Sequence, residues 1–344
     1  MTLADLDIGW GWTLAIKTVI VMGLIPAGAL VLGYTFLLKM MSHMQSRLGP
    51  MDPGGFHGWF QLIGDGIKFM QKEDIIPAGA DKRVFKMAPA VVVLSTFLMF
   101  VVLPGGPDFV VANLDVGVFY ALAVSSLSVI GVLMAGWASS NKYALLGSLR
   151  AAAQLIAYEL PLVLAVIGVV IQAGTMNLHG IVMQQADGEI FGWGGLGNPF
   201  ILTQFVGFAL FMVAAQAELS QPPFDMPVAE SELVAGYMVE YTGFRFLFFF
   251  IGEFGTAFVY AGLAATLFLG GWSVPFIDAD DDIMNFLGPG VLFVKIMLVA
   301  FLMFWARFTY PRLREDQLQA LAWKWLIPIS LVNILATGAL KVAF

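Results

Sequence analysis

Eight apolar segments, each about as long as a lipid bilayer is thick, constrain this chain more than any other feature. A helix needs about 20 apolar residues to cross the hydrocarbon core of a membrane. Because lipid offers no hydrogen bonds to an open backbone, these segments predict an all-α polytopic membrane protein with eight transmembrane helices. No linker divides the chain, so residues 1–344 are expected to form a single integral membrane domain. The segments are residues 13–38, 86–104, 116–138, 149–173, 199–217, 245–270, 288–308 and 324–343.

The composition excludes several functional classes. Only 12% of the residues are charged and 59% are hydrophobic, whereas soluble domains carry about 25% charged residues. The chain has no cysteine, which excludes thiolate-bound iron–sulfur clusters, zinc–thiolate sites and disulfides. Its three histidines are scattered, and no glycine-rich phosphate loop is present. We therefore expect this chain to bind no metal, haem, flavin, iron–sulfur cluster, nucleotide or nucleic acid.

The basic residues are distributed unevenly between the loops. Fourteen of the 17 lysines and arginines lie in or beside four alternate loops, at residues 39–85, 139–148, 218–244 and 309–323. The opposite loops hold none. Because basic loops stay on the cytoplasmic side, we expect these four structured loops to be cytoplasmic. The chain would then be a multi-pass protein of the plasma (inner) membrane, with both termini on the non-cytoplasmic side. The acidic N-terminus predicts no cleaved signal peptide.

The segment from Ala217 to Phe254 is unusually acidic for a region that joins two membrane spans. Acidic side chains near bilayer depth are costly and usually mark ion or proton pathways. Apolar and aromatic residues alternate with the acids, which argues against a plain solvated face. Carboxylates this close together repel one another when all are ionised, so some are expected to share protons. The acids are Glu218, Asp225, Glu230, Glu232, Glu240 and Glu253.

A further acid, Glu159, lies inside the fourth span, two residues before Pro161. Proline removes a backbone hydrogen bond, and a carboxyl buried beside such an irregularity can stay protonated and exchange a proton. Glu159 suits this role as well as it suits a structural carboxyl that hydrogen-bonds a neighbouring helix. The residues alone leave both interpretations open.

Residues 58–73, in the first basic loop, have apolar side chains at roughly helical spacing. Trp59, Leu62, Ile63 and Ile67 share one face, and Asp65 and Lys68 lie near it. The pattern predicts an amphipathic helix at the membrane interface, whose apolar face meets lipid or a lipid-soluble substrate. The alternative is a surface helix that only seals the bundle.

Several long motifs resemble the H-type membrane subunit of bacterial NADH:quinone oxidoreductase, which is respiratory complex I. The resemblance covers nearly the whole chain, and its motifs occur in the family's order. They are MQSRLGP at 44–50, QLIGDGIKFMQKEDIIP at 61–77, NKYALLGSLRAAAQLIAYE at 141–159, PFDMPVAESELVAGYMVEY at 223–241 and YPRLREDQL at 310–318.

The resemblance implies a membrane subunit that forms the quinone chamber and couples quinone reduction to proton translocation. Its substrate would be menaquinone or ubiquinone. Its partners would be membrane lipid, small membrane subunits, and peripheral iron–sulfur subunits docked on the cytoplasmic loops. The proton path would comprise Glu159, Glu218, Glu230, Glu232, Glu240 and Glu253. The quinone-binding set would comprise Gln45, Arg47, Trp59, Leu62, Ile63, Asp65, Ile67, Lys68, Gln221, Phe224, Asp225 and Arg307.

At four positions the family has charged residues and this chain has none. They are Leu37, Leu38, Gln221 and Val228. A charge lost alone leaves its buried partner unpaired, at a cost of about 3–5 kcal/mol. We therefore expect these four residues to lie together as one neutral patch.

Two other functions share parts of this pattern. The membrane anchor of a hydrogenase-type or ferredoxin-linked complex would have the same fold without a quinone, and its neighbouring genes would reveal it. A free-standing ion-coupled transporter would work as the purified chain alone. Many such transporters carry internal repeats, and we find none here.

Overall fold

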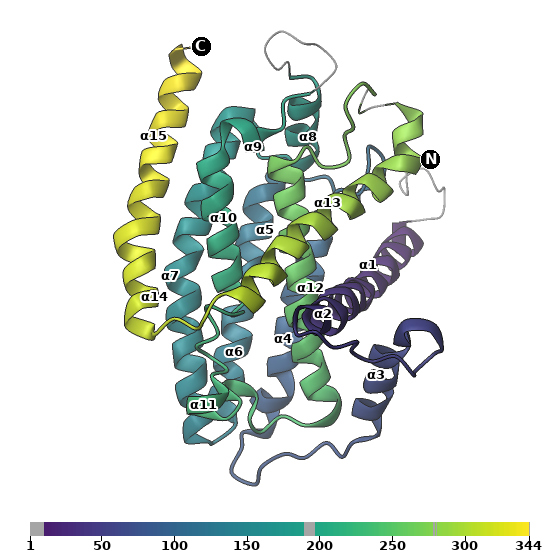
Figure 1. Ribbon diagram of the computed structural model, residues 1–344, viewed down its shortest axis with the longest axis vertical. Coiled ribbons are helices and arrows are strands. Elements are labelled where there is room, and N and C mark those ends of the chain that lie inside the picture. The colour runs from purple at the N-terminus through teal and green to yellow at the C-terminus, as the bar shows by residue number, and fades with distance from the viewer. Residues whose placement is uncertain (1–9, 189–196, 278, 280, 344) are drawn as a thin grey trace.

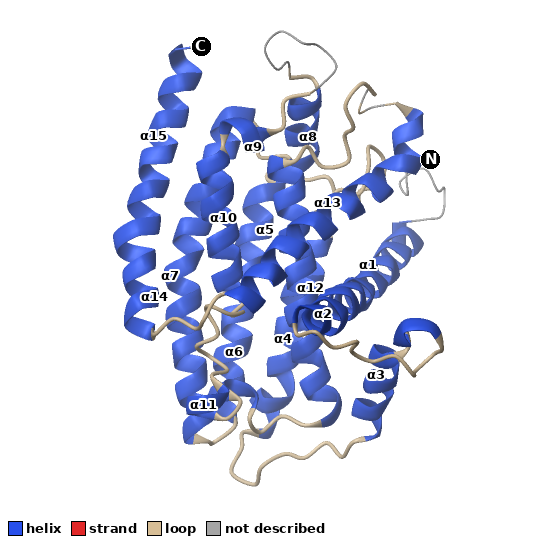
Figure 2. Ribbon diagram, in the orientation of Figure 1, coloured by secondary structure: helices blue, strands red, loops and turns tan. Residues whose placement is uncertain are grey.

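The computed structural model describes residues 10–188, 197–277, 279 and 281–343. These residues form helices and loops, with no strand among them (Figure 1, Figure 2). The predicted all-α fold is confirmed. The chain termini, residues 1–9 and 344, lie outside the described residues, so their expected location stays a prediction.

The helices along the chain differ widely in length. The first half has α1 (Trp10–Leu32), η1 (Gly33–Met40), α2 (Met41–Met44), η2 (Phe56–Gly58), α3 (Gln61–Gln71), α4 (Lys82–Phe100), α5 (Gly117–Ser125), α6 (Leu127–Ala138), α7 (Lys142–Ala173) and α8 (Leu178–Ala186). The second half has α9 (Phe200–Thr203), α10 (Phe205–Glu218), α11 (Glu230–Leu233), η3 (Gly236–Met238), α12 (Gly243–Phe268), α13 (Asp282–Thr309), α14 (Glu315–Leu321), η4 (Ala322–Leu326) and α15 (Ile327–Ala343).

Within the described residues, seven helices are long and apolar enough to cross a membrane. They match seven of the eight expected spans. The fifth expected span, residues 199–217, is instead broken into α9 and the 14-residue α10. The count of eight is therefore not confirmed by helix length.

The break in the fifth span falls at Gln204, which lies between α9 and α10. The Gln204 side chain donates to the Thr337 hydroxyl (2.7 Å) and accepts from the Asn333 amide (3.0 Å). Both partners belong to α15. Gly168 and Gly207 leave the space for these side chains, because a Cβ at either position would lie 3.0–3.1 Å from Gln204 Oε1. The break thus positions a buried polar contact that fixes the last helix to the bundle.

Small residues allow the central helices to approach closely. A Cβ on Gly136 would lie 2.0 Å from the Ser148 hydroxyl, and one on Gly147 would lie 2.7 Å from the Gly236 backbone. Close packing through small residues is typical of membrane bundles. Helices α4, α6, α7, α10 and α12 form the compact part, while α13 crosses it obliquely (Figure 1).

The expected amphipathic helix is α3, which lies beside α12 at the edge of the bundle (Figure 1). No residue of α3 is fully buried. Ile63, Ile67 and Met70 are exposed, whereas Leu62 packs against Gly33 of η1. Part of the apolar face of α3 therefore contacts the bundle, and the rest is exposed on the surface of the chain.

The acidic loop after α10 is held in place by neighbouring helices. The buried Gln154 amide donates to the backbone carbonyls of Ala217 (2.7 Å) and Phe224 (2.8 Å). The loop after α13 adds a backbone hydrogen bond from Leu313 to Pro223 (3.0 Å). These contacts hold the loop against the middle of α7 and the segment that follows α13.

The three lysines outside the basic loops all donate to backbone carbonyls. Lys17 donates to Val111 (2.7 Å), and Lys341 donates to Ile171 and Gln172 near the end of α7. Lys295 donates to Leu269 and Ser273 just after α12. Cations are favourable at helix C-termini, so Lys295 and Lys341 stabilise helix ends.

Candidate functional site

A cavity of about 210 Å³ lies among α4, α6, α7, α12, the segment after α10 and the end of α13. We call it the acidic cavity. Its polar lining is Ser128, Glu218, Ser220, Asp225, Glu230, Tyr237, Glu253, Thr256 and Arg307. It brings together four of the acids singled out in the sequence, from separate elements of the chain.

Glu253 lies well inside the membrane-spanning helix α12, about 15 Å from the start of the helix at 1.5 Å per residue. One of its carboxylate oxygens accepts a hydrogen bond from the Gln221 amide (3.3 Å). The same oxygen lies 3.5 Å from Arg307 Nη1. The Arg307 guanidinium also lies over the rings of Phe254 and Phe304. A single cation and a neutral amide thus hold the Glu253 carboxylate.

Asp225 faces the cavity from the loop after α10, and Arg312 lies 3.4 Å from it. Burial raises the pKa of Asp225, while the charges of Arg312 and Arg307 oppose that rise. Burial also raises the pKa of Tyr237, and the neighbouring Glu253 and Asp225 raise it further. Tyr237 therefore contributes a protonated hydroxyl to the cavity that these two acids also line.

Glu218, the last residue of α10, is 9% exposed. Among the described residues, neither of its carboxylate oxygens has a hydrogen-bond partner. The charged group that acts on it is Glu159 of α7, a half-buried acid. A buried carboxyl without a donor strongly favours its neutral form. Glu159 of α7 and Glu218 of α10 thus form a pair of acids that interact electrostatically.

The other predicted path residues lie toward the surface. Glu230 lines the acidic cavity but is exposed to solvent. Glu232 pairs with Arg150 (2.6 Å), whose hydrogen bond lowers the pKa of Glu232. Glu240 accepts a hydrogen bond from Asn141 (2.6 Å) at the turn before α7. The structure does not place Glu232 or Glu240 in the lining of the acidic cavity.

A second cavity, of about 520 Å³, lies among α1, η1, α3 and α12. We call it the aliphatic pocket. Its lining is Pro26, Ala29, Leu30, Leu37, Leu38, Leu62, Ile63, Asp65, Gly66, Ile67, Lys68, Phe69, Met70, Phe246, Leu247, Phe250 and Ile251. The charged pair among these residues is Asp65 with Lys68 (3.0 Å), on the polar side of α3.

The predicted quinone-binding set divides between several places. Five of its residues line the aliphatic pocket: Leu62, Ile63, Asp65, Ile67 and Lys68. Asp225 and Arg307 line the acidic cavity, and Gln221 contacts Glu253 there. Trp59 stacks on Tyr34, with ring centroids 4.6 Å apart. Gln45 and Arg47 hydrogen-bond each other on the exposed turn after α2. Phe224 is buried against Tyr158.

The four neutral replacements line no common cavity. Leu37 and Leu38 line the aliphatic pocket, and Val228 lines the acidic cavity. Gln221 contacts Glu253, which keeps Arg307 as its cation. The four residues therefore contact different parts of the structure. The cavity linings give no support to the expectation that they form one neutral patch.

Sequence reasoning missed the hydroxyls of the acidic cavity. Ser128, Tyr237 and Thr256 line it together with the acids. A sequence signal was present, because Glu253 and Thr256 are three residues apart and share one face of a helix. This spacing did not stand out in the sequence, because the other spans also contain single serines, threonines and tyrosines.

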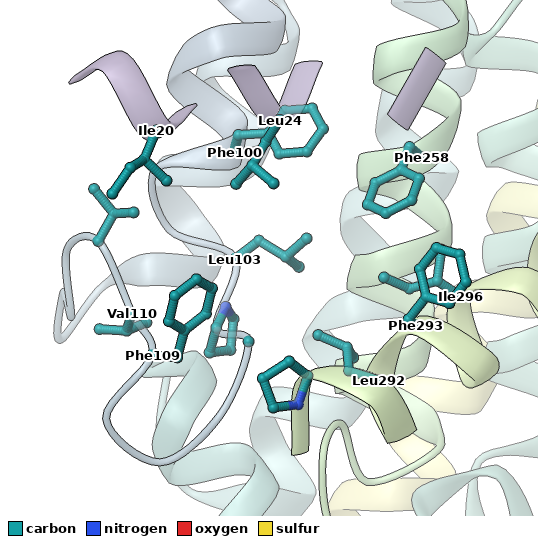
Figure 3. Close-up of a pocket in the computed structure, with 14 residues that line it drawn as sticks. Ile20, Leu24, Phe100, Leu103, Phe109, Val110, Phe258, Leu292, Phe293 and Ile296 are labelled. Atoms are coloured by element: carbon teal, nitrogen blue, oxygen red, sulfur yellow. The ribbon is translucent and has the colours of Figure 1, made fainter. Parts of the chain in front are cut away.

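A third cavity, of about 180 Å³, lies between α1, the loop after α4, α12 and α13 (Figure 3). The described side chains that line it are all apolar. They include Ile20, Leu24, Phe100, Leu103, Phe109, Val110, Phe258, Leu292, Phe293 and Ile296. None of these side chains could carry a proton, which separates this cavity from the acidic one.

These features define a polytopic integral membrane protein with an acid-lined cavity next to an apolar pocket. A family model described as NADH dehydrogenase matches residues 16–338. An H-type subunit of the NADH-quinone oxidoreductase of Syntrophobacter fumaroxidans is 46% identical over 342 residues, covering 95% of this chain and 97% of that relative. The chain belongs to this family, which confirms the resemblance found in its motifs.

Two further relatives agree with this placement. The H-type subunit of the NADH-quinone oxidoreductase of Anoxybacillus flavithermus is 45% identical over 323 residues, covering 93% of this chain and 92% of its own. Its counterpart from Geobacillus kaustophilus is 46% identical over 310 residues, covering 89% and 87%. The similarity therefore extends over almost the full length of each protein.

Proposed function

We propose that this chain is the membrane subunit through which an NADH–quinone oxidoreductase couples quinone reduction to proton translocation. The observation that carries the proposal is the acidic cavity. It places Glu218 of α10 and Glu253 of α12 beside a loop whose Asp225 pairs with Arg312. Acids at membrane depth are expensive to maintain and are retained where protons or ions move.

The aliphatic pocket supplies a route for the isoprenoid tail of the quinone. Such a tail gains about 25 cal/mol for each Å² that it removes from water, and it needs a continuous apolar surface more than specific hydrogen bonds. The exposed apolar residues of α3 extend this surface outward. We propose that the tail passes between α3 and α12, where Leu62, Ile67 and Phe250 line the pocket.

In this proposal, the change in charge during quinone reduction couples the reaction to proton movement. Reduction of a quinone to quinol takes up two electrons and two protons. We propose that the electrons arrive from an iron–sulfur cluster in a peripheral partner subunit. The charge that forms before the protons arrive raises the proton affinity of nearby acids. Arg307 pairs with Glu253, and its charge also acts on Asp225, so a change in the charge of one acid alters how strongly this cation stabilises the other.

The partners and location follow from the same proposal. The basic loops would face the cytoplasm of a cell bounded by a plasma (inner) membrane, where the peripheral subunits dock. The exposed apolar faces of α1 and α15 would meet lipid or small membrane subunits. Both termini would lie on the non-cytoplasmic side.

Glu218→Gln in the assembled, liposome-reconstituted complex tests this function. We expect quinone-dependent turnover and proton translocation to fall at least tenfold, while the amount of complex stays normal. Glu73→Gln is the matched control, because Glu73 is an exposed acid outside both cavities. Normal proton translocation by Glu218→Gln, at a normal complex level, would refute the proposal.

A further inference from the structure

A line of hydroxyl side chains continues from the acidic cavity deeper into the bundle. Glu253, Thr256 and Tyr260 of α12 are separated by three and four residues, so they share one face of the helix. Glu253 and Thr256 line the cavity. Tyr260 lies one turn beyond them and has no solvent exposure. The face of α12 that carries the acid thus stays polar past the end of the cavity.

Two further helices, α5 and α6, contribute hydroxyls to the same region. Ser128 of α6 lines the cavity, and Ser125 lies three residues earlier, at the end of α5. Ser125 is buried, and its hydroxyl donates to the Leu122 carbonyl (2.6 Å). Its oxygen keeps lone pairs that can accept a further hydrogen bond.

The Tyr260 hydroxyl is a buried polar group that its surroundings do not satisfy. Within the described part of the chain it makes no hydrogen bond of good geometry, although Ser125 lies close to it. The charged group that acts most strongly on it is Glu218, followed by Glu159. Both carboxylate oxygens of Glu218 also lack a donor. Buried polar groups are rarely left unpaired, since each one costs about 1–3 kcal/mol.

We propose that Tyr260 positions the proton of Glu218. The Tyr260 hydroxyl donates a hydrogen bond to Glu218 when the acid is ionised, directly or through one bound water. It accepts a hydrogen bond from Glu218 when the acid is protonated. The tyrosine keeps its own proton throughout, so only Glu218 gains or loses charge. This inference rests on the proposed function, because it assigns a role to Tyr260 within the same acidic path.

Tyr260→Phe in the assembled complex removes only the hydroxyl and keeps the ring, which packs edge-on to Phe211. We expect proton translocation to fall about tenfold, the rate equivalent of one hydrogen bond to a charged group. We also expect the infrared carbonyl band of protonated Glu218, identified by its loss in Glu218→Gln, to shift to higher frequency. Tyr241→Phe is the control, because it removes a buried hydroxyl that donates to the Phe85 carbonyl, and it should leave the band in place.

A double variant separates positioning from simple packing. If Tyr260 acts through Glu218, Tyr260→Phe with Glu218→Gln will be no slower than Glu218→Gln alone. Multiplied losses in the double variant, or an unshifted carbonyl band in Tyr260→Phe, would overturn the inference. Wild-type pumping by Glu218→Gln would instead refute the proposed function, while the band shift in Tyr260→Phe would still test the contact.

Discussion

The acidic cavity and the aliphatic pocket share one wall, helix α12, and meet two different faces of it. Phe246, Leu247, Phe250 and Ile251 face the aliphatic pocket, whereas Phe249, Gly252, Glu253 and Thr256 face the acidic cavity. One side holds a carboxylate, an arginine and hydroxyls. The other holds mainly hydrocarbon. Helix α12 thus separates the acidic cavity, which suits proton transfer, from the aliphatic pocket, which suits an apolar isoprenoid tail.

This partition limits how the two cavities can influence each other. A helix is about 10 Å across with its side chains. Two unit charges 10 Å apart interact by about 1.7 kcal/mol at an effective dielectric constant of about 20. That is slightly more than the energy of about one pKa unit. A charge on one side of α12 is therefore enough to bias the protonation of an acid on the other side, without any side chain crossing between the cavities.

The largest effect should come from removing the cation of the acidic cavity. Arg307→Met leaves Glu253 with only the Gln221 amide. Breaking a fully buried pair costs about 3–5 kcal/mol, and partial exposure of both side chains here places the expected loss at the lower end. We expect less assembled complex and a lower melting temperature, measured by native gel and thermal shift.

A double variant checks the cause of that loss. Arg307→Met with Glu253→Gln removes both charges, so it should recover much of the lost stability. If the double variant is as unstable as Arg307→Met alone, the arginine matters for packing over Phe254 and Phe304 and not for its charge.

An intermediate effect should come from placing a charge in the aliphatic pocket. Ile67→Glu should raise the Michaelis constant about tenfold for a long-tailed quinone and much less for a short-tailed one, because only the long tail needs the full apolar route. Steady-state kinetics with both substrates measures this. Ile67→Leu keeps volume and polarity and is the control. Equal effects on both quinones would mean that α3 only seals the bundle.

The smallest effect should come from the ion pair between Arg150 and Glu232, which lies outside the lining of the acidic cavity. The Arg150 hydrogen bond and charge lower the pKa of Glu232, so the folded protein binds fewer protons there than the unfolded chain. This contribution to stability is complete above the ordinary glutamate pKa of 4.5 and is lost as the pH falls through the lower folded value.

Arg150→Gln should therefore lower the melting temperature slightly at neutral pH and not at all at strongly acidic pH. The pair is partly exposed, so we expect less than about 1 kcal/mol. Thermal melts of both proteins across a pH series provide the measurement, and added salt should shrink the difference. A difference that is constant with pH would exclude the ion pair as its source.

The features that could be predicted from the sequence are those that depend on the composition of one helix alone. Long apolar runs identified the seven long spans, and acids within or beside them identified Glu218 and Glu253. The sequence did not predict what depends on contacts between helices. Gln204 appears as one polar residue in an apolar run, and only Asn333 and Thr337 explain why the span breaks there.

The division of the quinone-binding residues has the same cause. The resemblance puts Asp65 and Asp225, from two separate motifs, into one quinone-binding set, yet they line cavities on different faces of α12. Spacing along a helix indicates which residues share a face, but it does not indicate which neighbouring helix each face meets. The roles of Gln45, Arg47 and Phe224 in binding stay predictions.

The contact between Gln204 and α15 also sets an order of events during synthesis. The partners of Gln204 lie 129 and 133 residues later in the chain. At about 5–20 residues per second, roughly ten seconds pass before the ribosome supplies them. Until then the Gln204 side chain lacks these two partners, although its backbone is already hydrogen-bonded to Phe200 and Phe208. The final helix therefore completes this contact, and a chain cut short before Asn333 would leave the amide of Gln204 without its partners from α15.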